Sequence, residues 1–415
     1  MNDVLPSEIA AWHRLEGIAR ELFAAYAYRE IRVPIVEHTA LFKRSIGEFT
    51  DIVQKEMFTF EDPGGDSLTL RPEATAGIVR AMISNGLLHN QRQRVWCSGP
   101  MFRHEKPQRG RFRQFYQIDV EAFGFAGPDI DAELIMLSAR LLNRLGLERV
   151  ELNLNSLGTP ESRRAYREQL VNYFSAHKSR LDPDSLKRLE GNPLRILDSK
   201  NPDLQGLIAA APVLTEYLDA PSRQHFDGLC KHLDAVGIRY VVNPRLVRGL
   251  DYYTHTVFEW VTSELGSQGA VCSGGRYDGL VAQLGGKSTP AVGWALGQER
   301  LVELLKVQKG QTPDAAPDVY LVIAGERAEA AGLMLAERLR DELPRMHIET
   351  NCGAGSFKSQ LKRADNSGAQ FALVLGDSET DKQVIGLKSL RVEAPQSEVP
   401  WSDIAGILKS KLNQA

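Results

Sequence analysis

The chain has 415 residues, of which 43% are hydrophobic, and it is long enough for two or three domains that each bury a core. Its net charge of -3 at pH 7 argues against a protein that coats nucleic acid indiscriminately, because that binding depends on many phosphate contacts. No apolar run approaches the roughly 20 residues of a membrane-spanning helix, and the N-terminus carries Asp3 where a signal peptide would be basic. We therefore expect a cytoplasmic globular protein with no membrane partner.

The first part of the chain predicts one amphipathic helix followed by strands. Apolar residues recur at helical spacing from Ile9 to Tyr26, and a β-branched segment, 29–37, follows. Pro34 interrupts this segment, and because proline cannot donate a ladder hydrogen bond, the segment should lie at a sheet edge or a subunit boundary. The strands predicted next, of which the last two should form a long antiparallel hairpin, are 57–60, 67–70, 95–104 and 112–124.

The middle of the chain predicts a helical insertion within a strand-rich domain. Glu, Arg, Lys and Leu mix from 159 to 238, and prolines from Pro183 to Pro221 divide this stretch into short helices. Strand-like, glycine-rich sequence returns at 240–260 and 266–284, and a helix is expected from about Gln298. The first domain is thus predicted to span 1–310, interrupted by the insertion.

A polar, proline-marked segment, 311–317, predicts a linker to a second domain at 318–415. Strands and helices alternate beyond it, which is typical of a compact α/β domain. The expected strands are 319–324, 347–351, 371–375 and 383–387, and the expected helices are 327–343, 357–366 and 402–412. The fold class predicted for the whole chain is α/β, in which an α+β first domain with a mixed antiparallel sheet precedes the second domain.

Three familiar kinds of site are not supported by the residue spacing. Gly-Lys-Ser-Thr at 286–289 resembles a phosphate-binding loop, but residue 281 is Val where that loop needs glycine. Gly274 to Gly279 lacks the dinucleotide spacing and predicts only a tight turn with close backbone approach. The cysteines form no C-x-x-C pair, so we expect reduced thiols and no metal site built from protein side chains. They are Cys97, Cys230, Cys272 and Cys352.

The second strand of the predicted hairpin carries a line of polar and aromatic side chains. Alternate residues of a strand share one face, so five side chains should lie together. They are Arg113, Phe115, Gln117, Asp119 and Glu121. A core face would be apolar, so this combination favours a polar pocket with a ring on which a base can stack. An outer sheet face in contact with water is the alternative.

Four further segments carry candidate chemistry. Arg71 to Thr75 places a carboxylate and a hydroxyl just after a strand, where an ammonium group could be held, although a capped helix start also explains them. Arg248 to Tyr253 combines an arginine, an acid and two tyrosines. Arg300 lies in the first turn of a predicted helix, where the dipole disfavours a cation and an anion nearby would remove the conflict. The basic segment 103–113 is either a solvated hairpin tip or a local patch for nucleic acid.

Together these segments resemble a class II aminoacyl-tRNA synthetase, specifically histidyl-tRNA synthetase of the bacterial type, over nearly the whole chain. The helix before Pro34 is similar to the first motif of the class, a dimer-forming element. The second motif resembles Arg103 to Glu105 with Arg111 to Gly124, and the third resembles Gly297 to Arg300. The histidine-specific segments are Leu246 to Tyr253 and Gly274 to Asp278.

The resemblance implies a pocket for L-histidine. It assigns the ammonium group to Glu73, Thr75 and Gln117, and the imidazole to Glu121 and Tyr253. A buried carboxylate and a phenol can satisfy both nitrogens of an imidazole. The other histidine-binding residues that it implies are Ala74, where the family usually has glycine, and Arg103, Arg248, Tyr252 and Tyr277. It gives no role to Asp119.

The resemblance also implies that ATP and tRNA(His) are substrates and that Mg²⁺ is a cofactor. It implies a homodimer as well. Arg248 would be the chief catalytic residue, with Arg103 on the α-phosphate and Arg300 on the γ-phosphate, because a guanidinium is always charged. The other ATP-binding residues would be Phe115, which stacks the adenine, Glu105 and Arg111. The contacts with the tRNA acceptor end would be Lys106, Gln108, Arg109 and Arg113. The domain at 318–415 would bind the anticodon.

Two other functions compete with this interpretation. One is a catalytically silent, histidine-sensing paralogue, similar to the regulatory subunit of a histidine-biosynthetic phosphoribosyltransferase. Such proteins generally lack the second domain, and the full set of Arg103, Arg248 and Arg300 favours the enzyme. The other is a class II synthetase for a different amino acid, which Glu121 together with the tyrosine pair disfavours.

Overall fold

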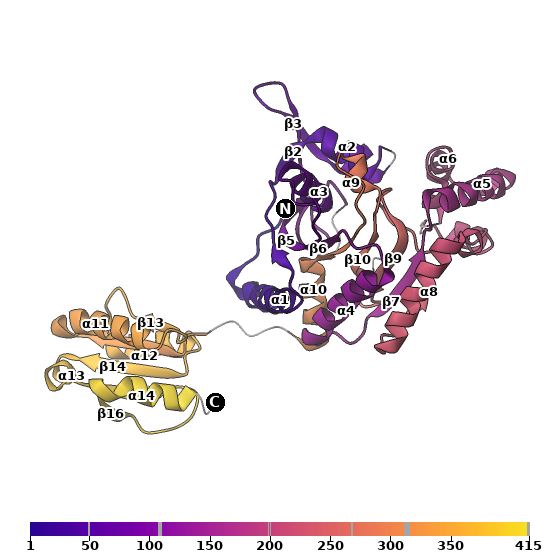
Figure 1. Ribbon diagram of the computed structural model, residues 1–415. Helices are drawn as coiled ribbons and strands as arrows, with labels where there is room; N and C mark the ends of the chain where they lie inside the picture. Colours follow the sequence, from indigo (N-terminus) through magenta and orange to yellow (C-terminus); the bar gives the residue numbers. More distant parts are fainter. Residues whose placement is uncertain are drawn as a thin grey trace. The chain divides into compact units, whose positions relative to one another are not determined.

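The computed structural model describes residues 1–48, 50–106, 110–197, 199, 201–266, 269–310 and 316–412. The chain forms two compact units, Met1–Thr312 and Pro313–Ala415, and each has its own sheet (Figure 1). Over the described ranges, no helix is both long enough and apolar enough to cross a membrane.

The first unit is built on an eight-stranded mixed sheet. Its inner strands pair antiparallel, whereas each edge strand is short and pairs parallel with its neighbour. In spatial order the strands are β1 (Arg29–Glu30), β5 (Gln93–Phe102), β6 (Gln114–Phe123), β11 (Ala291–Gly297), β10 (Ala270–Arg276), β9 (Thr254–Val261), β7 (Glu151–Ser156) and β8 (Val241–Val242). The predicted hairpin is confirmed as β5 and β6, in which Gly99 lies opposite Gln117.

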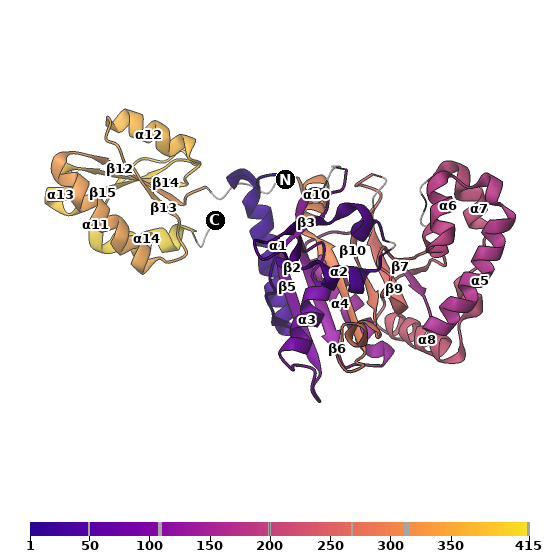
Figure 2. The same cartoon turned by 90° about the horizontal axis from the view of Figure 1, so that it is seen from above.

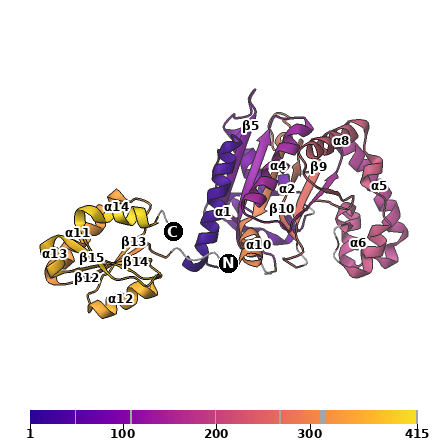
Figure 3. The ribbon, with the colours of Figure 1, turned by 90° about the horizontal axis from the view of Figure 1, so that it is seen from below.

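One face of this sheet packs against helices and forms the main core. Ile118, Val120 and Ala122 of β6 belong to this core, so the alternate residues of the same strand point to the opposite face. The covering helices are α1 (Pro6–Ala25), α4 (Pro128–Arg144), α8 (Ala220–Ala235) and α10 (Gln298–Lys309). Figure 3 shows α1, α4 and α8 lying along this side of the strands.

The opposite face is covered only in part, which leaves room for a cavity. A three-stranded sheet lies on this side, in the order β2 (Val36–His38), β4 (Ser67–Leu70) and β3 (Phe58–Glu61), and a five-residue π-helix, Ile52–Glu56, precedes β3. The helices on this side of the large sheet are α2 (Thr39–Ile46), α3 (Thr75–Ser84) and α9 (Leu280–Gln283). Pro34 lies between β1 and β2, which are edge strands of their sheets, as its missing N–H predicts.

The residues between β7 and β8 form the predicted helical module. Prolines occupy the first turns of its helices, where their missing N–H has no intrahelical partner to lose, so they start these helices rather than break them. The helices before α8 are α5 (Pro160–Ala176), α6 (Pro183–Glu190) and α7 (Gln205–Ala209), joined by short 3-10 turns. Figure 2 shows them standing beside the sheet, beyond β7. Tyr166, Leu170 and Phe174 of α5 are fully buried in their packing.

The second unit is a five-stranded sheet with helices on both faces. Its strands, in spatial order, are β13 (Ile348–Thr350), β12 (Val319–Ala324), β14 (Phe371–Gly376), β15 (Val384–Ser389) and β16 (Ser397–Pro400). Its helices are α11 (Glu326–Glu342), α12 (Phe357–Asn366), α13 (Asp377–Lys382) and α14 (Trp401–Leu412). The predicted strands and helices are all present, but the sequence did not indicate α13 or β16. The expected α/β fold class is thus confirmed, with an α+β first unit.

Candidate active site

A cavity of about 800 Å³ lies on the partly covered face of the large sheet, and we call it the pocket. It gathers most of the site residues predicted from the sequence: Glu73, Thr75, Arg103, Glu105, Arg111, Phe115, Gln117, Glu121, Arg248, Tyr252, Tyr253, Tyr277 and Arg300. Ala74 is buried at the start of α3 and is not among the lining residues. Exposed Lys106 and half-buried Arg113 also lie outside the lining, and Gln108 and Arg109 fall outside the described residues.

Glu121 is the centre of a buried polar cluster at one end of the pocket. Its carboxylate accepts a hydrogen bond from the Thr75 hydroxyl at 2.7 Å and another from the Tyr277 hydroxyl at 2.5 Å. The Tyr252 and Tyr253 rings lie 5.5 Å and 6.5 Å from the Tyr277 ring. Burial raises the pKa of Glu121 well above its usual value, even though both hydrogen bonds lower it.

Glycines in the neighbouring strands make room for this cluster. A Cβ atom on Gly293 of β11 would lie 1.5 Å from the Glu121 carboxylate. Gly274 and Gly275 are equally confined, because a Cβ there would lie 2.1 Å and 2.4 Å from backbone carbonyl oxygens of adjacent strands. Both glycines lie inside strand β10, and the tight turn predicted for the segment Gly274 to Gly279 follows the strand, where the Leu280 N–H donates to the Tyr277 carbonyl oxygen at 3.1 Å. The predicted close backbone approach is also confirmed.

Glu73 serves the backbone at the start of α3. Its two carboxylate oxygens accept hydrogen bonds from the N–H groups of Thr75 and Ala76, each at 2.8 Å. Glu73 therefore caps the start of α3, as one reading of the sequence predicted. The Thr75 side chain does not cap the helix but donates to Glu121. Burial is the main reason that the pKa of Glu73 is raised.

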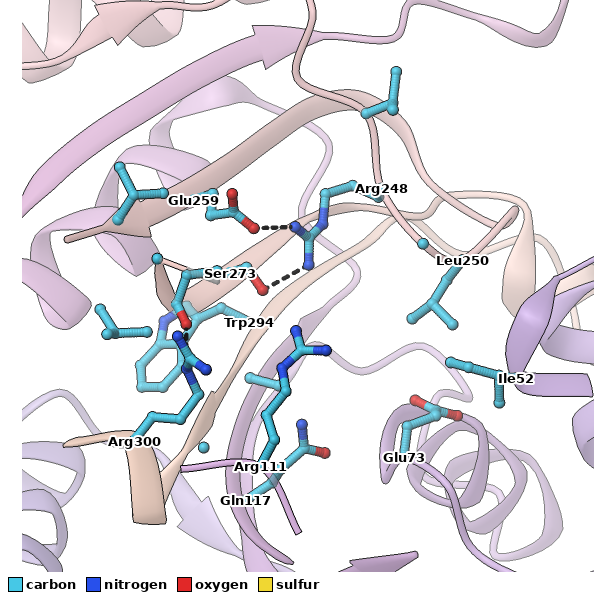
Figure 4. Close-up of a pocket in the computed structure, with 18 of the residues that line it drawn as sticks. Ile52, Glu73, Arg111, Gln117, Arg248, Leu250, Glu259, Ser273, Trp294 and Arg300 are labelled. Carbon is cyan, nitrogen blue, oxygen red and sulfur yellow. Dashed lines mark hydrogen bonds and ion pairs between the residues drawn. The ribbon is translucent and has the colours of Figure 1, made fainter. Parts of the chain in front are cut away.

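Arg248 lies in the loop between β8 and β9, and its guanidinium is fixed over the sheet. It donates to the Glu259 carboxylate at 2.8 Å and to the Ser273 hydroxyl at 2.6 Å, as the dashed lines in Figure 4 show. Burial alone would lower the pKa of Arg248, but the charge of Glu259 raises it. The side chain is thus a fixed, permanently charged group in the pocket wall.

The helical module holds the loop that carries Arg248. From α5, Arg163 donates to the carbonyl oxygen of Asp251 at 3.2 Å and also to that of Tyr253. From the segment after α6, the Asn192 amide donates to the Asp251 carboxylate at 2.8 Å, and Arg195 donates to the Arg248 carbonyl oxygen at 3.3 Å. These three residues, which we call the loop clamp, therefore position the loop from outside the sheet.

The other part of the pocket concentrates positive charge. Arg111 pairs with Glu105 at 2.8 Å, and the Arg103 guanidinium lies 5.3 Å from the centre of the Phe115 ring. Arg300 donates to the Ala270 carbonyl oxygen at 2.6 Å. Burial, and then the charge of Arg111, lowers the pKa of Arg300 to about 10. Arginine side chains gathered beside an aromatic ring form a suitable surface for a polyphosphate with an attached base.

The comparisons with known proteins agree with this geometry. A family model described as "Histidyl-tRNA synthetase" matches residues 1–301. The chain belongs to the histidyl-tRNA synthetase family. A second model, described as "Anticodon binding domain", matches residues 318–411. A histidine–tRNA ligase of Hydrogenovibrio crunogenus is 57% identical over 415 residues, which cover 100% of this chain and 97% of that protein.

Solved structures of histidyl-tRNA synthetases share the fold. The S. aureus histidyl-tRNA synthetase is 33% identical with a TM-score of 0.82, and the match covers 99% of this chain and 98% of that one. A Bacillus halodurans structure described as an ATP phosphoribosyltransferase regulatory subunit/histidyl-tRNA synthetase is 20% identical with a TM-score of 0.65, covering 91% and 97%. At that identity the second likeness concerns the fold alone. The family resemblance inferred from the sequence is confirmed.

Histidyl-tRNA synthetases use ATP, for which Mg²⁺ is the usual companion, and the pocket offers suitable ligands for that ion. Mg²⁺ is commonly held by one or two carboxylates together with substrate phosphates. Glu105 and Glu259 line the pocket next to its arginines and meet this requirement. Within the described part of the chain, no group of three or more His, Cys, Asp and Glu residues is arranged to hold a metal by itself.

Several residues of the site were missed at the level of sequence. Glu259 and Ser273 orient Arg248, and the loop clamp consists of Arg163, Asn192 and Arg195. Glu259 did leave a signal, because it is the one carboxylate in the largely buried strand Thr254–Val261. The clamp residues left none, since they resemble any polar residue of a solvated helical segment.

Proposed function

We propose that the chain activates L-histidine with ATP to form histidyl-adenylate and then transfers histidine to tRNA(His). One observation carries this proposal: the buried Glu121 cluster and the arginine-rich surface share a single pocket, with Arg248 in its wall. An imidazole-binding end and a polyphosphate-binding end in one cavity suit a reaction that joins the two substrates. As an enzyme of translation, it would act in the cytoplasm.

Histidine would bind with its ring at the Glu121 cluster. Glu121 and Tyr253 would satisfy the two ring nitrogens, with Tyr252 and Tyr277 packed around them. Glu73, Thr75 and Gln117 would hold the ammonium group. Ala74, at the start of α3, would take part through its backbone rather than its side chain. An amino acid whose side chain lacks the ring nitrogens would leave these buried groups unpaired, which disfavours its binding.

ATP would bind along the arginine-rich surface. Phe115 would stack the adenine, Arg103 would contact the α-phosphate, and Arg300 would contact the γ-phosphate, with Arg111 and Glu105 alongside. Mg²⁺ would add positive charge at the outer phosphates, where Glu105 and Glu259 could hold it.

Activation joins the two substrates at the α-phosphorus. A carboxylate oxygen of histidine forms a bond to the α-phosphorus while the bond to the bridging oxygen of the β-phosphate breaks, and pyrophosphate leaves. Negative charge develops on the oxygens at the α-phosphorus. Arg248 would stabilise this charge, because Glu259 and Ser273 hold its guanidinium in place before the reaction begins.

Transfer to the RNA would involve both units of the chain. A hydroxyl of the terminal adenosine would attack the carbonyl carbon of histidyl-adenylate, and AMP would leave. The segment between β5 and β6, with Lys106, Gln108, Arg109 and Arg113, would meet the acceptor end.

We assign the catalytic domain to 1–310 with its insertion at 159–238, the linker to 311–317 and the anticodon-binding domain to 318–415. The protein would be a homodimer.

The first prediction tests the activity itself. The purified chain should exchange labelled pyrophosphate into ATP when histidine is present, because adenylate formation is reversible. The measurement is the exchange rate with each of the twenty amino acids in turn. Absence of exchange with histidine, or equal exchange with another amino acid, would refute the proposal. A histidine-sensing paralogue would bind histidine without exchange, so the same assay separates the two functions.

The second prediction concerns the anticodon-binding domain. A chain shortened to residues 1–312, the first compact unit, should keep histidine-dependent exchange. Charging of tRNA(His) should fall by at least about 10²-fold in kcat/KM, because a second linked contact with the same RNA commonly contributes this much. The measurement is aminoacylation of the RNA by both proteins. Undiminished charging would mean that the unit after the linker does not bind this RNA productively.

A further inference from the structure

Asp119 is a pocket residue to which the resemblance gives no role. It lies on β6 between Gln117 and Glu121, on the face that lines the pocket, and its side chain is 1% exposed. Across the sheet it is opposite Cys97 of β5 and Ala295 of β11. Its Oδ2 atom has no hydrogen-bond partner among the described residues, and neither has the amide Oε1 atom of Gln117.

The groups around Asp119 do not neutralise it. The charged and titratable groups facing it are Glu73 at the start of α3, Glu121 on the same face of β6, Arg71 after β4, Arg103 after β5, Cys97 on β5 and Cys272 on β10. Within the described ranges, neither arginine forms an ion pair with Asp119. Arg71 donates to the carbonyl oxygens of Pro100 and Val33, and Arg103 donates to that of Pro72. A buried carboxyl without a donor is costly, so a group that supplies one is expected.

The chemistry of that group follows from its neighbours. Asp119 and Gln117 present two buried oxygen acceptors on one strand face, and the Glu73 carboxylate adds negative charge nearby. A ligand group that satisfies them must carry several N–H donors and a positive charge. A primary ammonium group has three donors and no acceptor, and it fits both requirements.

We propose that Asp119 is a further ligand of the histidine ammonium group, which its carboxylate holds together with the Gln117 amide oxygen. This inference rests on the proposed function and extends it, because it adds a residue to the amino-acid subsite. Glu73, whose oxygens already accept hydrogen bonds from the backbone of α3, is then not the only carboxylate at the ammonium group.

The proposal has a consequence for protons. Burial, and then the charge of Glu73, raises the pKa of Asp119 to about 8. The carboxyl of the free protein is therefore mostly protonated at pH 7, and an arriving cation favours its ionised form. Histidine binding should then release a proton from Asp119, and binding should tighten as pH rises towards about 8.

The test compares the full chain with Asp119→Asn by titration calorimetry with histidine in the absence of ATP. We expect the substitution to weaken histidine binding by about 10- to 100-fold, the range for a lost hydrogen bond to a charged group. Both proteins are then titrated with 3-(imidazol-4-yl)propionate, which lacks the ammonium group. Because the lost contact is with that group, the two proteins should bind this analogue equally. In buffers of different ionisation enthalpy, the variant should also release fewer protons on binding histidine.

A thermal measurement excludes a merely structural role. The pKa of Asp119 is 3.8 in the unfolded chain but about 8 in the folded chain. The folded chain therefore binds the Asp119 proton more tightly, and the free energy of unfolding falls as pH rises from 3.8 to about 8. Asparagine does not ionise, so Asp119→Asn without ligand should melt at a higher temperature than the unaltered chain at pH 8. Asp227→Asn, an exposed position on α8, should change neither binding nor melting.

The outcomes are distinct. Unchanged histidine affinity in Asp119→Asn, equal loss for both ligands, or a lower melting temperature at pH 8 overturns the inference. Histidine-dependent exchange by the unaltered chain shows separately whether the proposed function stands. If the unaltered chain neither binds histidine nor supports exchange, the proposed function itself has failed.

Discussion

Arg248→Ala should slow histidyl-adenylate formation by at least about 10²-fold, the scale for removing one preorganised donor from a developing charge. The loss is expected in the chemical step, because Glu259 and Ser273 fix the guanidinium before substrates arrive. The measurement is the single-turnover rate of adenylate formation at saturating histidine and ATP. Arg248→Lys should recover only part of the rate, since an ammonium group keeps the charge but not the planar fork of donors.

Arg164→Ala provides the matched control for this experiment. Arg164 is exposed on α5, next in sequence to a residue of the loop clamp, and it does not line the pocket. Its replacement should leave the single-turnover rate unchanged. If Arg248→Ala also left that rate unchanged, the assignment of charge stabilisation to Arg248 would be wrong.

Glu121→Gln should lower kcat/KM for histidine in the exchange assay by about 10³-fold or more. A site built to hydrogen-bond a substrate group can discriminate by about 10⁴ to 10⁵ when one partner is missing. Glutamine has nearly the same size and shape as glutamate, so the loss should reflect changed hydrogen bonding with the imidazole rather than collapse of the pocket. The measurement is exchange as a function of histidine concentration, with the melting temperature recorded in parallel.

The control for this variant is Glu161→Gln, on the exposed surface of α5. It should preserve both kcat/KM and the melting temperature. A normal kcat/KM in Glu121→Gln would remove Glu121 from the imidazole site. A large loss accompanied by a fall in melting temperature would instead indicate that Glu121 acts through the buried hydroxyls of Thr75 and Tyr277.

Much of the fold could be predicted because its elements carry local signals. The period-two pattern of β6 separated Ile118 and Val120 from Gln117 and Glu121, and the structure keeps that division between core and pocket. By contrast, α13 is a six-residue, wholly polar helix, and β16 is a four-residue edge strand. Segments this short and polar have no periodic apolar face from which a prediction could start.

The candidate site could likewise be predicted only in part from the sequence. Residues on one strand or in one short motif could be grouped by spacing, whereas their partners come from distant parts of the chain. Ser273 is 25 residues from Arg248, and Arg163 is 90 residues from Tyr253. Such contacts arise only when the sheet and the helical module are assembled. The sequence did not show that Gly274 and Gly275 belong to strand β10, because glycine is depleted in strands and gives no strand signal.

The loop clamp limits how this protein can be shortened or recombined. Helices α5, α6 and α7 stand beside the sheet, yet Arg163, Asn192 and Arg195 from this part of the chain hydrogen-bond to the backbone or side chains of the loop that bears Arg248. The module and the loop therefore form one structural unit. A chimaera that exchanges the helices must also exchange compatible residues at 248–253, or restore these hydrogen bonds in another way.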